Sequence, residues 1–105
     1  MTGSKSVYRL STEDGGESMR TALSDRERAI QMARELYEQK KAEGMDMSTG
    51  PCLAEEIIPD WCVDIAHSPR QKVDDLPENQ CQLFRQGRVH HFVELDPDGN
   101  LLRAG

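Results

Sequence analysis

The strongest pattern along the chain is a run of apolar residues, spaced three and four apart, between Ser24 and Glu43. This spacing forms one apolar stripe along an α-helix and leaves the charged residues on its other faces. Ser24 can accept a hydrogen bond from the backbone of Glu27, and the Glu27 side chain can reach back, which is the capping-box pattern. Gly44 follows at the position of a left-handed C-terminal cap. We predict a helix over residues 24–43 that buries Ala29, Ile30, Ala33, Leu36 and Tyr37.

Alternation of polar and apolar residues predicts β-strands in three segments, namely 6–11, 61–67 and 89–95. In the second segment, one face would carry Trp61, Val63, Ile65 and His67, and the other would carry Cys62, Asp64 and Ala66. Because both faces of this segment are largely apolar, we expect it to lie in the interior of a sheet.

The remaining segments are less regular. Residues 17–22 follow a glycine turn and are predicted to form a returning strand, while 52–58 fits either a helical turn or an extended segment. Asp75 can cap a short second helix that would end at Gly87. Residues 96–100 carry the Pro, Asp and Gly of a tight hairpin turn, so the segment from Leu101 should be a final edge strand.

The element order β(β)αβαββ predicts an α+β domain. Hairpins at both ends favour a mainly antiparallel sheet of four or five strands, and amphipathic helices must cover an apolar sheet face. We therefore expect a two-layer sandwich in which one long and one short helix pack on the sheet, with the strand order left open. A length of 105 residues suits a single domain, and we expect residues 1–5 to be flexible.

The charge of the chain bears on its partners and location. A formal net charge of -6, with Lys and Arg interleaved among acidic residues, argues against binding to nucleic acid or to anionic membranes. No apolar run approaches the ~20 residues of a membrane-spanning helix, and the first residues lack the apolar core of a secretory signal. We predict a cytoplasmic protein.

The cysteine and histidine residues show no spacing typical of a metal site. Cys52, Cys62, His67, Cys81 and the pair His90-His91 form neither a Cys-x-x-Cys nor a His-x-x-x-His unit. No dinucleotide or phosphate-loop motif is present either. We therefore predict no metal and no cofactor. The odd number of cysteines in a cytoplasmic chain predicts three reduced, unpaired thiols.

The two adjacent histidines offer the most specific chemistry. Alternation would place His91 on the apolar face of its strand and His90 on the face of Phe92 and Glu94, which predicts that His91 is the more buried ring. If this strand neighbours residues 61–67, Asp64 could pair with an imidazole, which is a minimal arrangement for acid–base catalysis. The simpler alternative is a half-buried histidine bonded to a backbone carbonyl.

Two functional hypotheses follow. The preferred one is a non-catalytic module that binds a protein partner or a second copy of itself, with aromatic residues near Trp61 and Phe92 as anchors. The alternative is a small-molecule-binding domain or an enzyme that uses an Asp/His cluster, with or without Cys, on the central strands. The candidate site is Trp61, Asp64, His67, His90, His91 and Phe92, and no residue is assigned a catalytic role.

Overall fold

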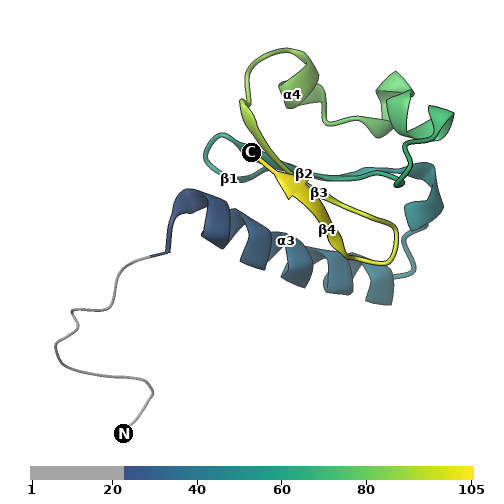
Figure 1. Ribbon diagram of the computed structural model, residues 1–105, viewed down its shortest axis with the longest axis horizontal. Helices are drawn as coiled ribbons and strands as arrows, with labels where there is room; N and C mark the ends of the chain where they lie inside the picture. The colour runs from purple at the N-terminus through teal and green to yellow at the C-terminus, as the bar shows by residue number, and fades with distance from the viewer. Residues whose placement is uncertain (1–22) are drawn as a thin grey trace, which may run out of the picture.

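The computed structural model describes residues 23–105, which form a four-stranded mixed sheet with one long helix against it (Figure 1). The helices and strands, in chain order, are α3 (Asp25–Ala42), β1 (Cys52–Ile58), β2 (Trp61–Ile65), α4 (Gln82–Arg85), β3 (His91–Leu95) and β4 (Leu101–Ala104). Short 3₁₀ turns span Met47–Thr49, Lys72–Asp75 and Pro77–Asn79. The segment 1–5, expected to be flexible, and the strands predicted at 6–11 and 17–22 lie outside the described residues.

Helix α3 begins and packs as the sequence predicts. The Ser24 hydroxyl accepts a hydrogen bond from the Glu27 backbone N–H at 3.1 Å, and Glu27 accepts one from the Ser24 N–H at 3.0 Å. This satisfies two backbone donors that the first turn of a helix leaves open. The residues predicted to face the core either lie in it, as Ala29, Ala33 and Tyr37 do, or pack at its margin, as Ile30 and Leu36 do.

The sheet has the strand order β1-β2-β3-β4. The outer pairs β1/β2 and β3/β4 are antiparallel, while the central pair β2/β3 is parallel. The ambiguous segment 52–58 is thus a strand, and β2 lies in the interior with β4 at an edge, as predicted. The sheet is mixed: two of its three strand pairs are antiparallel, and the parallel central pair, which the sequence did not indicate, is possible because the connection 66–90 is long enough to let the next strand run parallel.

That connection lies on the sheet face opposite α3, as Figure 1 shows from the position of α4. A short second helix is present as predicted, but it covers only Gln82–Arg85 and not 75–87, and two 3₁₀ turns precede it. The Glu55 side chain of β1 accepts the N–H groups of residues 82 and 83, so the helix begins there and not at Asp75. The two-layer arrangement with both helices on one face is therefore wrong.

Each face of the sheet has its own apolar cluster. Tyr37 and its helix pack on the alternate strand residues Val63, Ile65, Val93 and Leu95, while Cys62, Cys81 and Val89 form the smaller cluster on the other face. The faces predicted for β2 are confirmed. Val89 is not on the face of His91, because β3 begins only at His91 and strand alternation does not extend further back. Within residues 23–105, no helix is both long and apolar enough to cross a membrane.

Candidate functional site

A cavity of about 320 Å³ opens on the sheet face opposite α3. The central strands form its floor, β4 and the connection 66–90 form its walls, and α4 stands at its rim. Its lining residues are Cys62, Asp64, Arg70, Gln80, Cys81, Phe84, Arg85, Phe92, Glu94 and Arg103. The volume lies at the lower end of the range for small-molecule sites in proteins.

The parallel register of β2 and β3 sets two acidic residues side by side on the cavity floor. Asp64 is paired with Glu94, and Cys62 with Phe92. Because side chains alternate along a strand, all four point away from α3 while Val63 and Val93 point toward it. Two neighbouring carboxyl groups in a partly buried site repel each other when both are ionised.

Of the two carboxyl groups, Glu94 is the one that accepts hydrogen bonds from arginine side chains. Its side chain is 9% exposed, and it accepts a hydrogen bond from Arg103 at 2.9 Å and one from Arg70 at 3.1 Å. Arg70 also bonds Asp75 within the connection at 2.7 Å, while its bond to Glu94 holds the connection against the sheet. The two guanidinium groups satisfy both oxygens of Glu94 and form one wall of the cavity.

Asp64 has no such partner. Its Oδ1 atom is buried and has no hydrogen-bond partner among residues 23–105. Desolvation, and then the neighbouring charge of Glu94, raise the pKa of Asp64 to about 7, although Arg70 acts in the opposite direction. At neutral pH this carboxyl therefore exchanges between a neutral form that can donate a hydrogen bond and an ionised form that can only accept.

Cys62 lies beside it as a neutral thiol. Burial, and then the charge of Asp64, raise the pKa of Cys62 to about 12. A nucleophilic cysteine needs a lowered pKa, because the thiolate is the reactive form. The geometry thus gives Cys62 a packing role in the cavity floor and argues against its use as a nucleophile.

The cavity also has an aromatic and positively charged part. The rings of Phe84 and Phe92 meet edge to face, with centroids 5.8 Å apart and planes at 78°. The Arg103 guanidinium lies 5.4 Å from the centre of the Phe92 ring. Arg85 also lines the cavity and forms no ion pair with any residue of the described part of the chain.

The adjacent histidines lie outside the cavity. His90 Nδ1 is 2.8 Å from Asp60 Oδ1, and His91 Nε2 is 3.5 Å from Asp60 Oδ2. The side chain of His91 is 46% exposed and that of His90 is 64% exposed, which confirms that His91 is the more buried. Pairing with Asp64 was a wrong expectation, because the β1–β2 turn presents Asp60 to both rings. The buried Trp61 stacks on His91 at 4.7 Å, on the α3 side of the sheet.

His67 is also separate from the cavity, just beyond the end of β2. Its Nδ1 atom lies 2.9 Å from Asp74 Oδ1, and its backbone N–H donates to Asp74 Oδ2 at 2.9 Å. Desolvation alone would raise the pKa of Asp74, but the N–H groups of Gln71 and His67 and the His67 ring together hold it below its usual value. Of the six candidate residues, only Asp64 and Phe92 line the cavity.

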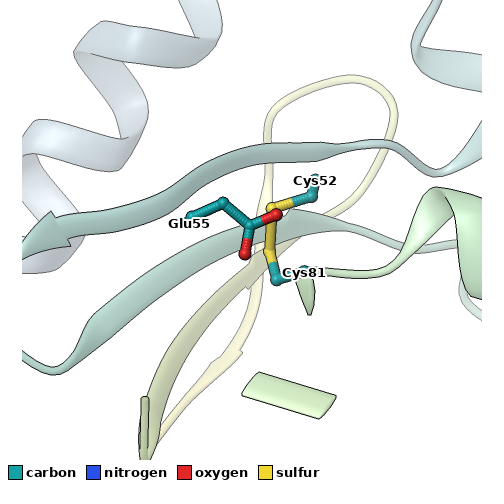
Figure 2. A group of neighbouring side chains, drawn as sticks. All are labelled: Cys52, Glu55 and Cys81. Carbon is teal, nitrogen blue, oxygen red and sulfur yellow. A yellow bond between two sulfur atoms is a disulfide. The ribbon is translucent and has the colours of Figure 1, made fainter. Parts of the chain in front are cut away.

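The structure also corrects the prediction made for the three cysteines. Cys52 and Cys81 form a disulfide, with Cα atoms 5.0 Å apart (Figure 2), and only Cys62 is a free thiol. The prediction of three unpaired thiols is therefore wrong. An odd count leaves one cysteine over but does not exclude a bridge between the other two. The connection 66–90 brings Cys81 onto β1 across 29 residues of sequence, and no local pattern signals that approach.

Sequence reasoning missed most of the cavity, including Arg70, Arg85, Glu94 and Arg103. A usable signal existed for Glu94, which shares a strand face with Phe92 in the middle of an otherwise apolar segment. The arginines carry no such signal, because they come from an irregular connection, a one-turn helix and an edge strand. In comparisons with protein-family models, with curated proteins and with solved structures, the chain finds no match.

Proposed function

We propose that this protein binds a small organic acid with an aromatic or apolar body in the cavity above β2 and β3. The observation that carries the proposal is the cavity itself. It combines an arginine that forms no ion pair within residues 23–105 with a carboxyl of raised pKa on the cavity floor. Small-molecule sites are concave, mostly apolar and provided with a few polar groups, and this cavity has that character.

The charge of the lining favours an anionic ligand. Three arginines and two acidic side chains line the cavity, whereas the whole chain carries a formal net charge of -6. Arg70 and Arg103 are already bonded to Glu94, which leaves Arg85 for a ligand carboxylate. A planar guanidinium matches a carboxylate with two parallel hydrogen bonds.

Asp64 adds a dependence on pH. With its pKa raised to about 7, Asp64 is mostly neutral below that pH and can donate a hydrogen bond to the ligand. Above that pH it becomes an anion beside a second anion, so binding of an organic acid should weaken as the pH rises. The apolar body of the ligand would lie against Phe84 and Phe92.

The test uses three probes of similar size: phenylacetate, its uncharged amide and phenethylamine. Changes in backbone amide NMR signals should cluster at residues 84–85 and 92–94 for phenylacetate and be weaker for the other two. Arg85→Gln should reduce the affinity for phenylacetate by about tenfold, the loss expected for one charged hydrogen-bonded contact. Arg88→Gln, an exposed change outside the cavity, is the matched control.

The outcomes separate clearly. Equal effects of the two arginine variants, tighter binding of the amine, or signal changes away from the cavity would each refute the proposal. Asp64→Asn provides a further check, because it should remove the weakening of phenylacetate binding between about pH 6 and pH 8. If the wild-type affinity does not change over that range, Asp64 does not contact the ligand.

Association with a protein partner or a second copy of the chain is our second proposal, and Leu76 and Phe84 favour it. These side chains are 42% and 41% exposed, and both lie on the connection 66–90. Large exposed apolar residues often anchor interfaces. Sedimentation velocity over a wide concentration range tests self-association. Phe84→Ser should abolish any self-association that is seen. A monomer at every concentration would exclude self-association and leave only binding to a different protein.

We also keep the cytoplasm as the proposed location, with no nucleic-acid partner. In that reducing compartment the Cys52–Cys81 disulfide would be open in a large fraction of molecules. The thiol state of the purified protein alone does not reveal the compartment, because cysteines can oxidise after cell lysis. Alkylation of thiols before lysis, followed by mass measurement, would show the state of this pair in the cell.

A further inference from the structure

The disulfide lies next to a carboxylate at the junction of β1 and α4. Cys52 is the first residue of β1, Cys81 directly precedes α4, and Glu55 projects from β1 toward both sulfur atoms (Figure 2). One ligand atom from each of the three residues can be chosen so that all lie within 4.8 Å of one another. Two sulfurs and one carboxylate oxygen in such a cluster match the donor types that Zn²⁺ takes in proteins.

Glu55 is held in place by backbone hydrogen bonds. Its Oε2 accepts the N–H of Gln82 at 3.1 Å, and its Oε1 accepts the N–H of Leu83 at 2.9 Å. Each carboxylate oxygen has two lone pairs, so one on each oxygen is still available to a cation. Hydrogen bonds that orient a ligand in this way are typical of the surroundings of protein metal sites.

We propose that Cys52, Glu55 and Cys81 bind one thiophilic divalent cation such as Zn²⁺ when the disulfide is reduced. A thiol reductant attacks the sulfur of Cys52, the more exposed of the two residues, and the Cys81 sulfur leaves as a thiolate that takes up a proton. A second reductant thiol then releases Cys52 as a thiol, and the two reductant molecules become a disulfide. Cation binding displaces the protons of both cysteine thiols.

The geometry allows this change without movement of the strands. Around a tetrahedral Zn²⁺ with Zn–S bonds of about 2.3 Å, two sulfurs lie about 3.8 Å apart. Cα atoms 5.0 Å apart are compatible with that separation through side-chain rotation alone. Because Cys52 and Glu55 are partly exposed, a water molecule can supply the fourth ligand. This site does not depend on the organic-acid proposal, since it uses neither Asp64 nor Arg85.

The test compares the full chain in its oxidised form and after reduction with a phosphine that is then removed under nitrogen. Co²⁺ is the probe, because thiolate ligation gives it an ultraviolet charge-transfer absorption. The reduced chain should show that absorption at one Co²⁺ per chain, and the oxidised chain should not. Competition with a chromogenic chelator then measures Zn²⁺ affinity.

Two pairs of variants assign the ligands. Cys52→Ser should lose about half of the charge-transfer absorption, while Cys62→Ser should leave it unchanged. Glu55→Gln should weaken Zn²⁺ binding by about tenfold or more, since even partners behind a metal ligand contribute 10- to 100-fold. Glu56→Gln is the matched control, because the Glu56 carboxylate bonds the Asp60 N–H instead.

Several results would overturn the site. These are a reduced chain without the charge-transfer absorption, equal effects of the Glu55 and Glu56 variants, or loss of binding on Cys62→Ser. Circular dichroism recorded before and after the metal addition covers the case in which reduction unfolds the chain. Metal-dependent recovery of the native spectrum supports the site, and failure to recover rejects it.

Discussion

Asp74 and His67 are joined twice, once through the imidazole at 2.9 Å and once through the backbone N–H at 2.9 Å. Asp74 is 1% exposed, and the same carboxylate accepts the N–H of Gln71 at 2.8 Å. Gly50 packs so closely against this carboxylate that a Cβ at that position would overlap it. The first turn of the connection 66–90 is thus organised around one buried acidic side chain.

The first prediction tests this role of Asp74. Asp74→Ala should lower the free energy of unfolding by about 3–5 kcal/mol, because it leaves buried N–H donors and a partly buried imidazole without their partner. Asp98→Ala, at an exposed turn position, should stay within about 0.5 kcal/mol. Urea denaturation of the two variants gives both numbers, and similar losses would contradict the role.

The pH dependence of the same residue follows from its lowered pKa. A carboxyl whose pKa is depressed in the folded state contributes stability above its unfolded pKa, here about 3.8, and loses it as the pH falls through the folded value. The difference in unfolding free energy between wild type and Asp74→Ala should therefore shrink in acid. A difference that stays constant down to about pH 2 would show that the carboxylate charge does not matter.

The pH dependence of the stability that Asp64 contributes should have the opposite sign. Its pKa is raised to about 7 from 3.8, so the folded state binds more protons than the unfolded state between these values. Its contribution to stability is greatest in acid and is lost as the pH rises to about 7. Asp64→Asn should therefore gain stability relative to wild type on going from about pH 5 to about pH 8. Asp98→Asn serves as the control and should show no such change.

A pair of glycine variants tests the contact between α3 and the last hairpin. Gly99 has a φ of 91°, and a Cβ there would lie 2.6 Å from the Tyr37 ring. Gly87 has a φ of 72°, but a Cβ there would meet nothing within 4 Å. Gly87→Ala should cost about 1–2 kcal/mol from backbone strain, and Gly99→Ala about 1–3 kcal/mol more from overpacking. Thermal unfolding of both variants measures these losses. If Gly99→Ala costs no more than Gly87→Ala, the Tyr37 ring moves aside to admit the new methyl group.

The disulfide predicts a simple thiol count. Without reductant, the unfolded chain should react with a thiol reagent at one site, Cys62, and after reduction at three. Opening the bridge, which joins residues 29 apart, should lower the free energy of unfolding by about 3 kcal/mol. Three reactive thiols before reduction would instead support the three unpaired thiols predicted from the sequence.

The sequence by itself determined the elements whose signals are local. The capping box of Ser24 and Glu27 and the apolar stripe along α3 need only neighbouring residues to act, and both are present. The final turn is equally local, with Asp96 accepting the N–H groups of residues 98 and 100 around Gly99. Strand alternation likewise assigned the faces of β2 correctly, because it follows from backbone geometry alone.

Only the tertiary structure decided which residues meet in the cavity and in the disulfide. The parallel register that places Asp64 beside Glu94 depends on the path of residues 66–90. A helix was predicted there over 75–87, but only Gln82–Arg85 are α-helical, and Glu55 of β1 accepts the first two N–H groups of that helix. The same path brings Cys81 to Cys52 and Arg70 to Glu94, across 29 and 24 residues of sequence. A pattern of neighbouring residues carries no information on such contacts, because their free energy is gained only after the intervening chain has folded.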